Sequence, residues 1–136
     1  MRRGLACTAL LLVIIAVTNK AIAAPDVRVP GIYSDLTYNN DSGDLHGTEL
    51  FIVVAPDDRG PRYSVFFQCW GEGGFDPVAI PAKVDGDKVS FIVPPPSVVA
   101  GAYEGRITKS GFDGSYRLDN GNTSSIHLKR KKSYWE

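Results

Sequence analysis

The chain has 136 residues, and its 15 lysine and arginine residues are balanced by 15 aspartate and glutamate residues. A chain of this length has room for one domain with one hydrophobic core. The lack of a basic excess argues against nucleic acid as a partner.

The first residues have the pattern of a secretory signal peptide. A basic start at Arg2 and Arg3 precedes an apolar run of 13 residues over 5–17. As a helix this run would span about 20 Å, which is short of the roughly 30 Å core of a bilayer. Small residues at Ala21 and Ala23 predict cleavage after Ala23.

Cleavage after Ala23 changes the charge balance and the cysteine content of the chain. We expect residues 1–23 to be the signal peptide and residues 24–136 to be a single all-β domain, secreted or periplasmic and without a transmembrane anchor after processing. The mature chain keeps 12 basic against 15 acidic residues and one cysteine, Cys69. With a single cysteine there is no internal disulfide, so packing and hydrogen bonds must hold the fold.

Beyond residue 30, apolar residues alternate with polar ones, and turn residues interrupt them at short intervals. This pattern is typical of an antiparallel up-and-down meander, and no stretch shows helical periodicity. We expect eight strands, near residues 31–38, 45–55, 62–70, 78–84, 88–93, 102–109, 112–118 and 123–130.

Two of these strands share a local pattern that bears on the architecture. Tyr103-Glu104-Gly105 and Phe112-Asp113-Gly114 repeat an aromatic, an acid and a glycine nine residues apart. Period 2 puts each glycine on the aromatic, inward face, where a missing side chain lets the strand coil tightly. The pattern favours a small closed barrel, and a two-sheet sandwich is the alternative.

The order of these features resembles a group of small secreted bacterial β-meander proteins of calycin-like, or lipocalin-like, type. The resemblance implies a fold and supplies no catalytic residue or cofactor. The stretches that carry it are Gly31-Ile32-Tyr33, Ser42 to Leu50, Ala82 to Phe91, Gly105, Gly114, Leu128-Lys129-Arg130 and Ser133-Tyr134-Trp135.

The predicted inward face is rich in aromatic residues. In an eight-stranded barrel these side chains either line a cavity for one small, largely apolar ligand or fill the interior completely. The residues are Tyr63, Phe67, Phe91, Tyr103, Phe112 and Tyr116.

Other aromatic residues fall in predicted loops and at the C-terminus. Trp70 and Phe75 flank the glycine-rich segment 71–74, and Trp135 follows the basic run Lys129 to Lys132. The two loop aromatics can close the barrel end or bind a partner. The basic run is either a solvated strand end or a patch that touches anionic polymers or lipid headgroups.

The polar residues suggest no catalytic or metal site. Cys69 shares an apolar face with Tyr63, Val65 and Phe67, so we expect an inert thiol, and we expect His46 and His127 to be solvated. Five polar residues crowd one turn, and oxygen ligands in a flexible loop suit calcium, but turns need the same residue types. The five residues are Asn39, Asp41, Asp44, His46 and Glu49.

These observations favour a non-enzymatic binding or interaction module with no cofactor. Its partner would be a small apolar ligand or an envelope or extracellular protein. An inhibitor or envelope-interaction protein that acts through its loops is the first alternative. An enzyme that uses carboxylates at a barrel mouth is the second, although the predicted inward faces contain no carboxylate.

Overall fold

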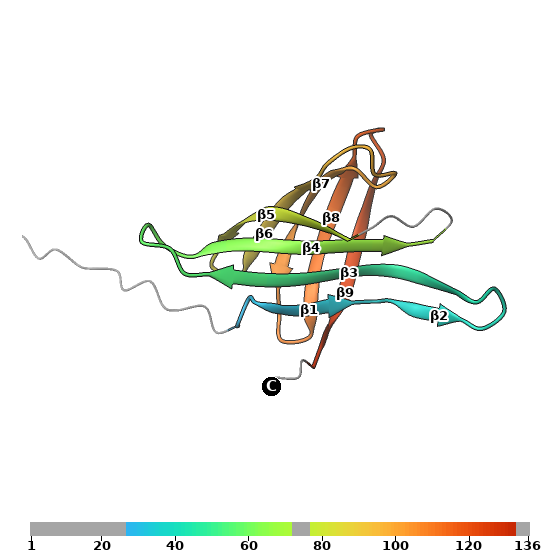
Figure 1. Ribbon diagram of the computed structural model, residues 1–136, viewed down its shortest axis with the longest axis horizontal. Coiled ribbons are helices and arrows are strands. Elements are labelled where there is room, and N and C mark those ends of the chain that lie inside the picture. The colour runs from blue at the N-terminus through green and yellow to red at the C-terminus, as the bar shows by residue number, and fades with distance from the viewer. Residues whose placement is uncertain (1–26, 72–76, 133–136) are drawn as a thin grey trace, which may run out of the picture.

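A computed structural model describes residues 27–71 and 77–132 of the chain. They form nine antiparallel strands in meander order (Figure 1). Among these residues there is no helix long and apolar enough to cross a membrane. The strands are β1 (Gly31–Ser34), β2 (Thr37–Asn39), β3 (Asp44–Ala55), β4 (Arg62–Trp70), β5 (Val78–Asp85), β6 (Lys88–Val93), β7 (Gly101–Ile107), β8 (Gly111–Leu118) and β9 (Thr123–Lys131).

The sheet closes on itself as a barrel of eight strands. Each strand pairs with its neighbour in sequence from β3 to β9, and β1 pairs with both ends of that series. Tyr33 of β1 is opposite Leu50 of β3 and opposite Arg130 of β9. The barrel, rather than the two-sheet sandwich, is therefore the architecture.

One predicted strand is divided in two. The chain turns out of the barrel wall after Ser34, so the predicted strand at 31–38 becomes β1 and the short β2, which pairs only with β3. At the break, the backbone N–H of Asp35 donates to the Thr48 carbonyl, and its carboxylate accepts from the Thr48 N–H at 2.6 Å. Gly47 permits this crossing because its φ is +117° and a side chain there would meet Asp35.

Alternation along the strands fills the barrel with apolar side chains. The predicted inward faces of the strands are confirmed, and they meet in one core. The buried core residues are Val29, Tyr33, Leu50, Ile52, Val65, Phe67, Ile80, Val89, Phe91, Val93, Tyr103, Ile107, Phe112 and Leu128.

The two predicted inward glycines bring β7 and β8 together tightly. Gly105 and Gly114 are directly opposite each other. A Cβ on Gly105 would lie 2.6 Å from the Asp113 carbonyl oxygen and 2.6 Å from the ring of Phe112. The ring of Phe112 therefore lies where a side chain at position 105 would be, and the absence of side chains at both glycines lets β7 and β8 approach closely.

Candidate binding site

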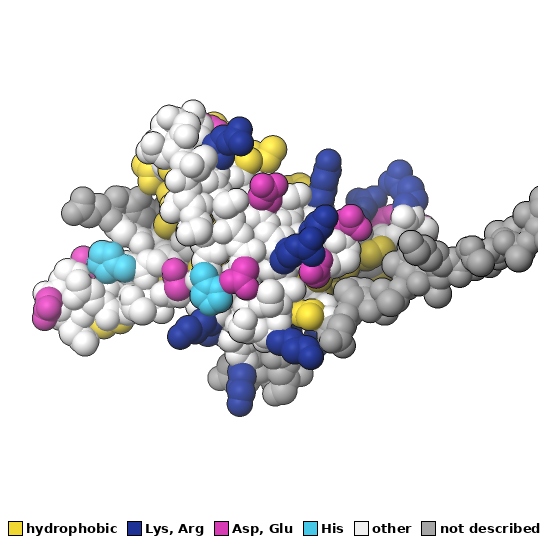
Figure 2. All heavy atoms as spheres, turned by 180° about the vertical axis from the view of Figure 1, so that it is seen from behind, with side chains coloured by type: hydrophobic (Ala, Val, Ile, Leu, Met, Phe, Trp, Pro, Cys, Tyr) yellow, Lys and Arg dark blue, Asp and Glu magenta, His cyan; other side chains and the backbone are white. Residues whose placement is uncertain are grey.

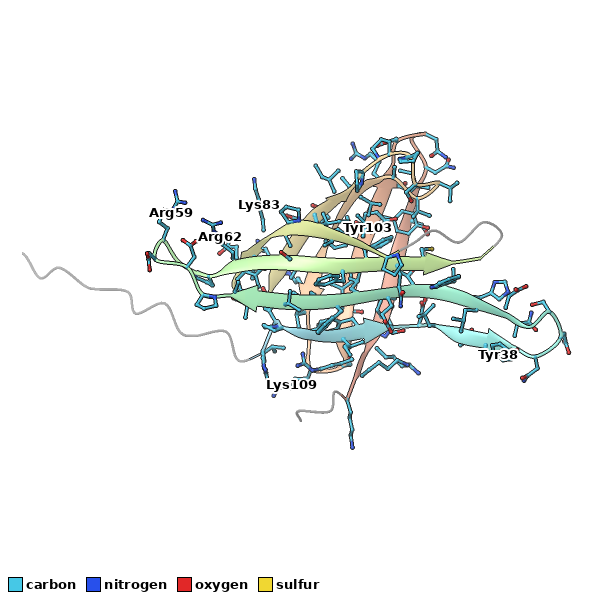
Figure 3. All side chains as sticks on the ribbon, in the orientation of Figure 1. Tyr38, Arg59, Arg62, Lys83, Tyr103 and Lys109 are labelled. Atoms are coloured by element: carbon cyan, nitrogen blue, oxygen red, sulfur yellow. The ribbon has the colours of Figure 1, made fainter. Side chains whose placement is uncertain are left out.

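The aromatic side chains predicted to line the barrel pack against one another. Tyr103 stacks on Phe91 and on Tyr116, with ring centroids 5.2 Å apart in each pair, and meets the edge of Phe67 at 5.1 Å. Phe112 is fully buried, whereas Tyr63 and Tyr116 are half-buried. The rings around Tyr103, which Figure 3 labels, thus form one packed aromatic group of the core.

The hydroxyl of Tyr103 is bound inside the protein. It donates a hydrogen bond of 3.0 Å to the carbonyl of Val99, in the connection between β6 and β7. Burial raises the pKa of this phenol well above its usual range, and the neighbouring Cys69 and Tyr116 raise it further. Tyr103 therefore stays neutral and serves as a structural element of the core.

Cys69 lies beside these rings, on the inward face where the alternation predicts it. It is half-buried, and its Sγ is 3.7 Å from the hydroxyl of Thr48 on the neighbouring strand β3. The thiol is thus packed between a core aromatic and a cross-strand hydroxyl.

An arginine binds the residues at the seam where β1 and β9 close the barrel. Arg130 continues the inward alternation of β9, and its guanidinium lies over the ring of Tyr33. It donates hydrogen bonds to the Tyr33 hydroxyl at 2.7 Å and to the carbonyls of Arg28 at 2.8 Å and Pro30 at 3.1 Å. The Tyr33 hydroxyl in turn donates to the Val29 carbonyl at 2.7 Å.

This arrangement corrects the interpretation of the basic run as a solvated strand end. Lys129 and Lys131 are exposed, but Arg130 between them is half-buried and points inward. The signal was present in the sequence, because Ile126, Leu128 and Arg130 follow the same period of two. A long side chain can place its charge at this seam and its stem within the wall.

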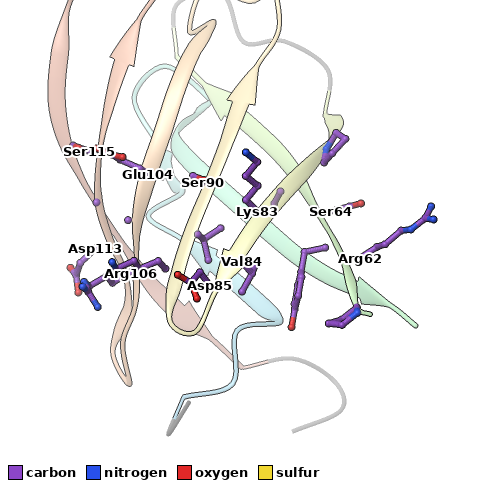
Figure 4. A pocket seen from close by; sticks show the side chains of 18 residues that line it. Arg62, Ser64, Lys83, Val84, Asp85, Ser90, Glu104, Arg106, Asp113 and Ser115 are labelled. Atoms are coloured by element: carbon purple, nitrogen blue, oxygen red, sulfur yellow. The ribbon is translucent and has the colours of Figure 1, made fainter. Parts of the chain in front are cut away.

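The barrel wall carries two adjoining hollows, lined by outward-facing residues together with core-facing ones, such as Tyr63 in the larger hollow and Phe91, Tyr103 and Tyr116 in the smaller. The larger, of about 1370 Å³, extends over β4 to β8 (Figure 4). The smaller, of about 640 Å³, extends over β5 to β9. Five residues line both hollows and alternate with core-facing ones along their strands, which puts them on the outer face. These residues are Pro81, Lys83, Ser90, Glu104 and Ser115.

Four of the shared residues form one row across the sheet. Lys83 is opposite Ser90, Ser90 is opposite Glu104, and Glu104 is opposite Ser115. Lys83 extends away from the barrel (Figure 3), and Figure 4 shows Lys83 on one side of Ser90 and Glu104 on the other. We call this set the central row.

Exposed apolar side chains lie beside the central row. Phe51, Phe66 and Ala79 are opposite one another on β3, β4 and β5, and the two phenylalanine rings are 6.0 Å apart. Pro81, two residues beyond Ala79, lines the smaller hollow with Ile92 and Ala102. We call these six residues the apolar band; Phe51 and Phe66 are 43% and 44% exposed and Ile92 is 67% exposed.

Paired charges also lie at the larger hollow, which Arg106 and Asp113 line. Asp113 on β8 pairs with His127 on β9, and Arg106 on β7 donates to both carboxylate oxygens of Asp87 at 2.9 Å. Figure 2 shows Lys, Arg, Asp, Glu and His side chains spread over the face that it views, with the hydrophobic ones toward its margins. His127 is exposed, as predicted, and its carboxylate partner was not foreseen.

Of the turn residues weighed as calcium ligands, Asn39 lies directly opposite Asp44. Asn39 accepts a hydrogen bond from the Asp41 N–H, and Glu49 accepts one from Gln68 at 2.8 Å, so both carry out structural roles. Within residues 27–71 and 77–132, no group of three or more His, Cys, Asp and Glu side chains could hold a metal ion. Trp70 ends β4 and is 37% exposed, whereas Phe75 and Trp135 lie outside the described residues.

Comparison with known proteins adds no relative. No family model, no curated protein and no solved structure matches this chain. Function is therefore inferred from the geometry of the chain itself, and the outer face of β3 to β8 is its candidate binding site.

Proposed function

We propose that this protein is a secreted, non-enzymatic binding module that recognises its partner on the outer face of the barrel. The observation that carries the proposal is the apolar band, which is continuous with the two outer hollows through Pro81, Ile92 and Ala102. Contiguous exposed apolar surface is costly in water, and in monomeric soluble proteins it commonly marks an interaction site.

The interior supports this placement of the site. The rings of Phe67, Phe91, Tyr103 and Tyr116 are in mutual contact, so a ligand in the lumen would have to displace packed side chains. Tyr33 is fully buried, and Arg130 binds its hydroxyl across the pairing of β1 and β9. In this proposal the chain is a calycin-like barrel that binds outside rather than inside.

Site-specific crosslinking in the cell that exports the protein tests this function. A photoreactive amino acid replaces Ile92 in the smaller hollow, and a matched variant carries it at Lys129, an exposed residue of β9 that lines neither hollow. We expect one defined adduct from position 92 and none from position 129. Equal adducts from both positions, or none from position 92, would contradict the proposal.

A dye measurement separates the outer face from the lumen. Saturable binding of an environment-sensitive apolar dye should be lost in Ile92→Ser and Phe66→Ser, since both side chains are exposed on the outer face. It should be unchanged in Phe67→Leu, which alters a fully buried ring of the core that lines neither hollow. Dye binding that survives both outer substitutions would favour the small-ligand lumen instead.

A further inference from the structure

We propose that the junction of the two outer hollows binds a short peptide with free termini and a central apolar side chain. The inference rests on the proposed function and names the chemistry of the ligand. It starts from two exposed charges of opposite sign, Lys83 and Glu104, in the central row.

Neither charge is neutralised by the protein. Among the described residues, the Lys83 ammonium and the Glu104 carboxylate have no hydrogen-bond or ion-pair partner, whereas the nearby Arg106 is paired with Asp87. Ser90 on β6 lies between them, so Lys83 and Glu104 are on strands that are not neighbours. The row therefore offers one cationic and one anionic group to the same bound molecule.

The distance between Lys83 and Glu104 determines how long a zwitterionic ligand must be to reach both. Lys83 and Glu104 are two strand spacings apart, which is about 10 Å at the backbone. An extended peptide of three residues covers about 10 Å. A single amino acid carries both charges on one carbon and is too short to follow the row without bending both side chains toward its centre.

The closed sheet decides how such a peptide is held. A peptide often adds a strand to an exposed sheet edge, but the strands at this site are paired on both sides. Side chains must then supply the contacts, and the hydroxyls of Ser90 and Ser115 can each donate and accept toward peptide amides. The peptide thus lies across the strands, with its amino terminus toward Glu104 and its carboxylate toward Lys83.

The smaller hollow supplies the place for the apolar side chain. Pro81, Ile92 and Ala102 line it beside the central row, and Ile92 is 67% exposed when no ligand covers it. Covering this surface removes apolar area from water. We therefore expect Ala-Leu-Ala to bind more tightly than Ala-Ala-Ala.

Calorimetric titration with Ala-Leu-Ala tests the inference. Acetylation of its amino terminus or amidation of its carboxyl terminus should each weaken binding about 10-fold, because each removes one charge-assisted contact. Lys83→Gln and Glu104→Gln should weaken the unmodified peptide to a similar degree. Lys129→Gln and Asp58→Asn, exposed substitutions that line neither hollow, are the matched controls and should change nothing.

Pairing each modified peptide with each protein variant shows which terminus contacts which side chain. The acetylated peptide should bind Glu104→Gln as well as it binds the wild type, and the amidated peptide should bind Lys83→Gln as well as the wild type. Urea midpoints equal to that of the wild type will show that the variants are folded. Additive losses in these pairs would overturn the assigned orientation and the inference with it.

Other results separate the inference from the proposed function. Free leucine binding as tightly as Ala-Leu-Ala, or no peptide binding at all, would overturn the peptide assignment. If the adduct at position 92 still forms in that case, the outer face remains the binding site and takes a different partner. Loss of that adduct contradicts the proposed function independently of the peptide result.

Discussion

The guanidinium of Arg130 lies 5.4 Å from the ring centroid of Tyr33 and donates a hydrogen bond of 2.7 Å to its hydroxyl. The two residues come from the strands that close the barrel, β1 and β9. One cation therefore binds both the ring at this seam and the carbonyls of Arg28 and Pro30 that precede it.

We predict that Arg130→Ala lowers the free energy of unfolding by about 2–3 kcal/mol, because it removes hydrogen bonds to a charged group together with a cation–π contact. Arg130→Lys should restore only a small part, since an ammonium lacks the planar fork of donors. Urea unfolding measures both variants. The control, Lys129→Ala, is exposed and should stay within about 0.5 kcal/mol of the wild type; an Arg130→Ala variant as stable as this control would contradict the prediction.

Substitutions at the glycine pair should also destabilise the barrel. We predict a loss of about 2–3 kcal/mol for Gly105→Ala, because its Cβ would lie 2.6 Å from both the Asp113 carbonyl oxygen and the ring of Phe112. Gly114→Ala should behave similarly, because its Cβ would collide with the Glu104 carbonyl. Gly71→Ala is the control, as nothing lies within 4 Å of its Cβ. Equal melting temperatures for all three variants would disprove the close approach of β7 and β8.

Cys69 should react slowly with thiol reagents in the native protein. Its side chain is half-buried and lies beside Thr48 on the inward face of the wall. A cysteine placed at Ser125, on the exposed outer face, in a Cys69→Ala background provides the comparison. Labelling of Cys69 should be much slower than labelling at position 125, and both should become fast in urea. Equal native rates would mean that the packing around Cys69 is open to solvent.

The buried phenol of Tyr103 predicts a loss of stability at alkaline pH. Burial raises its pKa in the folded state, so the unfolded chain releases this proton first as the pH rises above about 10. The stabilisation is complete below the unfolded pKa and is lost as the pH rises toward the folded one. The free energy of unfolding, measured with urea at a series of alkaline pH values, should therefore fall less steeply with pH in Tyr103→Phe than in the wild type. Parallel curves would show that Tyr103 ionises normally.

We predict that the exported protein begins at Ala24, because Ala21 and Ala23 supply the small residues that the signal peptidase requires. Amino-terminal sequencing of protein recovered outside the cytoplasm measures this directly. Ala23→Asp should block cleavage and leave the precursor in the exporting cell. A recovered protein that begins at Met1 would contradict the predicted processing. The site lies outside the residues that the structure describes.

The alternation of side chains was enough to predict most of the fold. The faces of Tyr63, Phe67 and Cys69 on β4, and of Gly105 and Gly114 on β7 and β8, follow from period 2 within single strands. Local pattern failed after Ser34, where β1 ends and the chain leaves the barrel wall before β2 begins at Thr37. At that break, Asp35 binds Thr48 on the neighbouring strand β3, and the two residues are 13 apart in the sequence.

The sequence by itself determined which side chains face inward, because strand geometry is local and repeats every two residues. Only the tertiary structure decided what those faces meet. Closure brings Arg130 to Tyr33, 97 residues away, and half-buries this one residue of the basic run. It likewise aligns Lys83, Ser90 and Glu104 as one row, since register between strands depends on turns and on closure of the whole sheet.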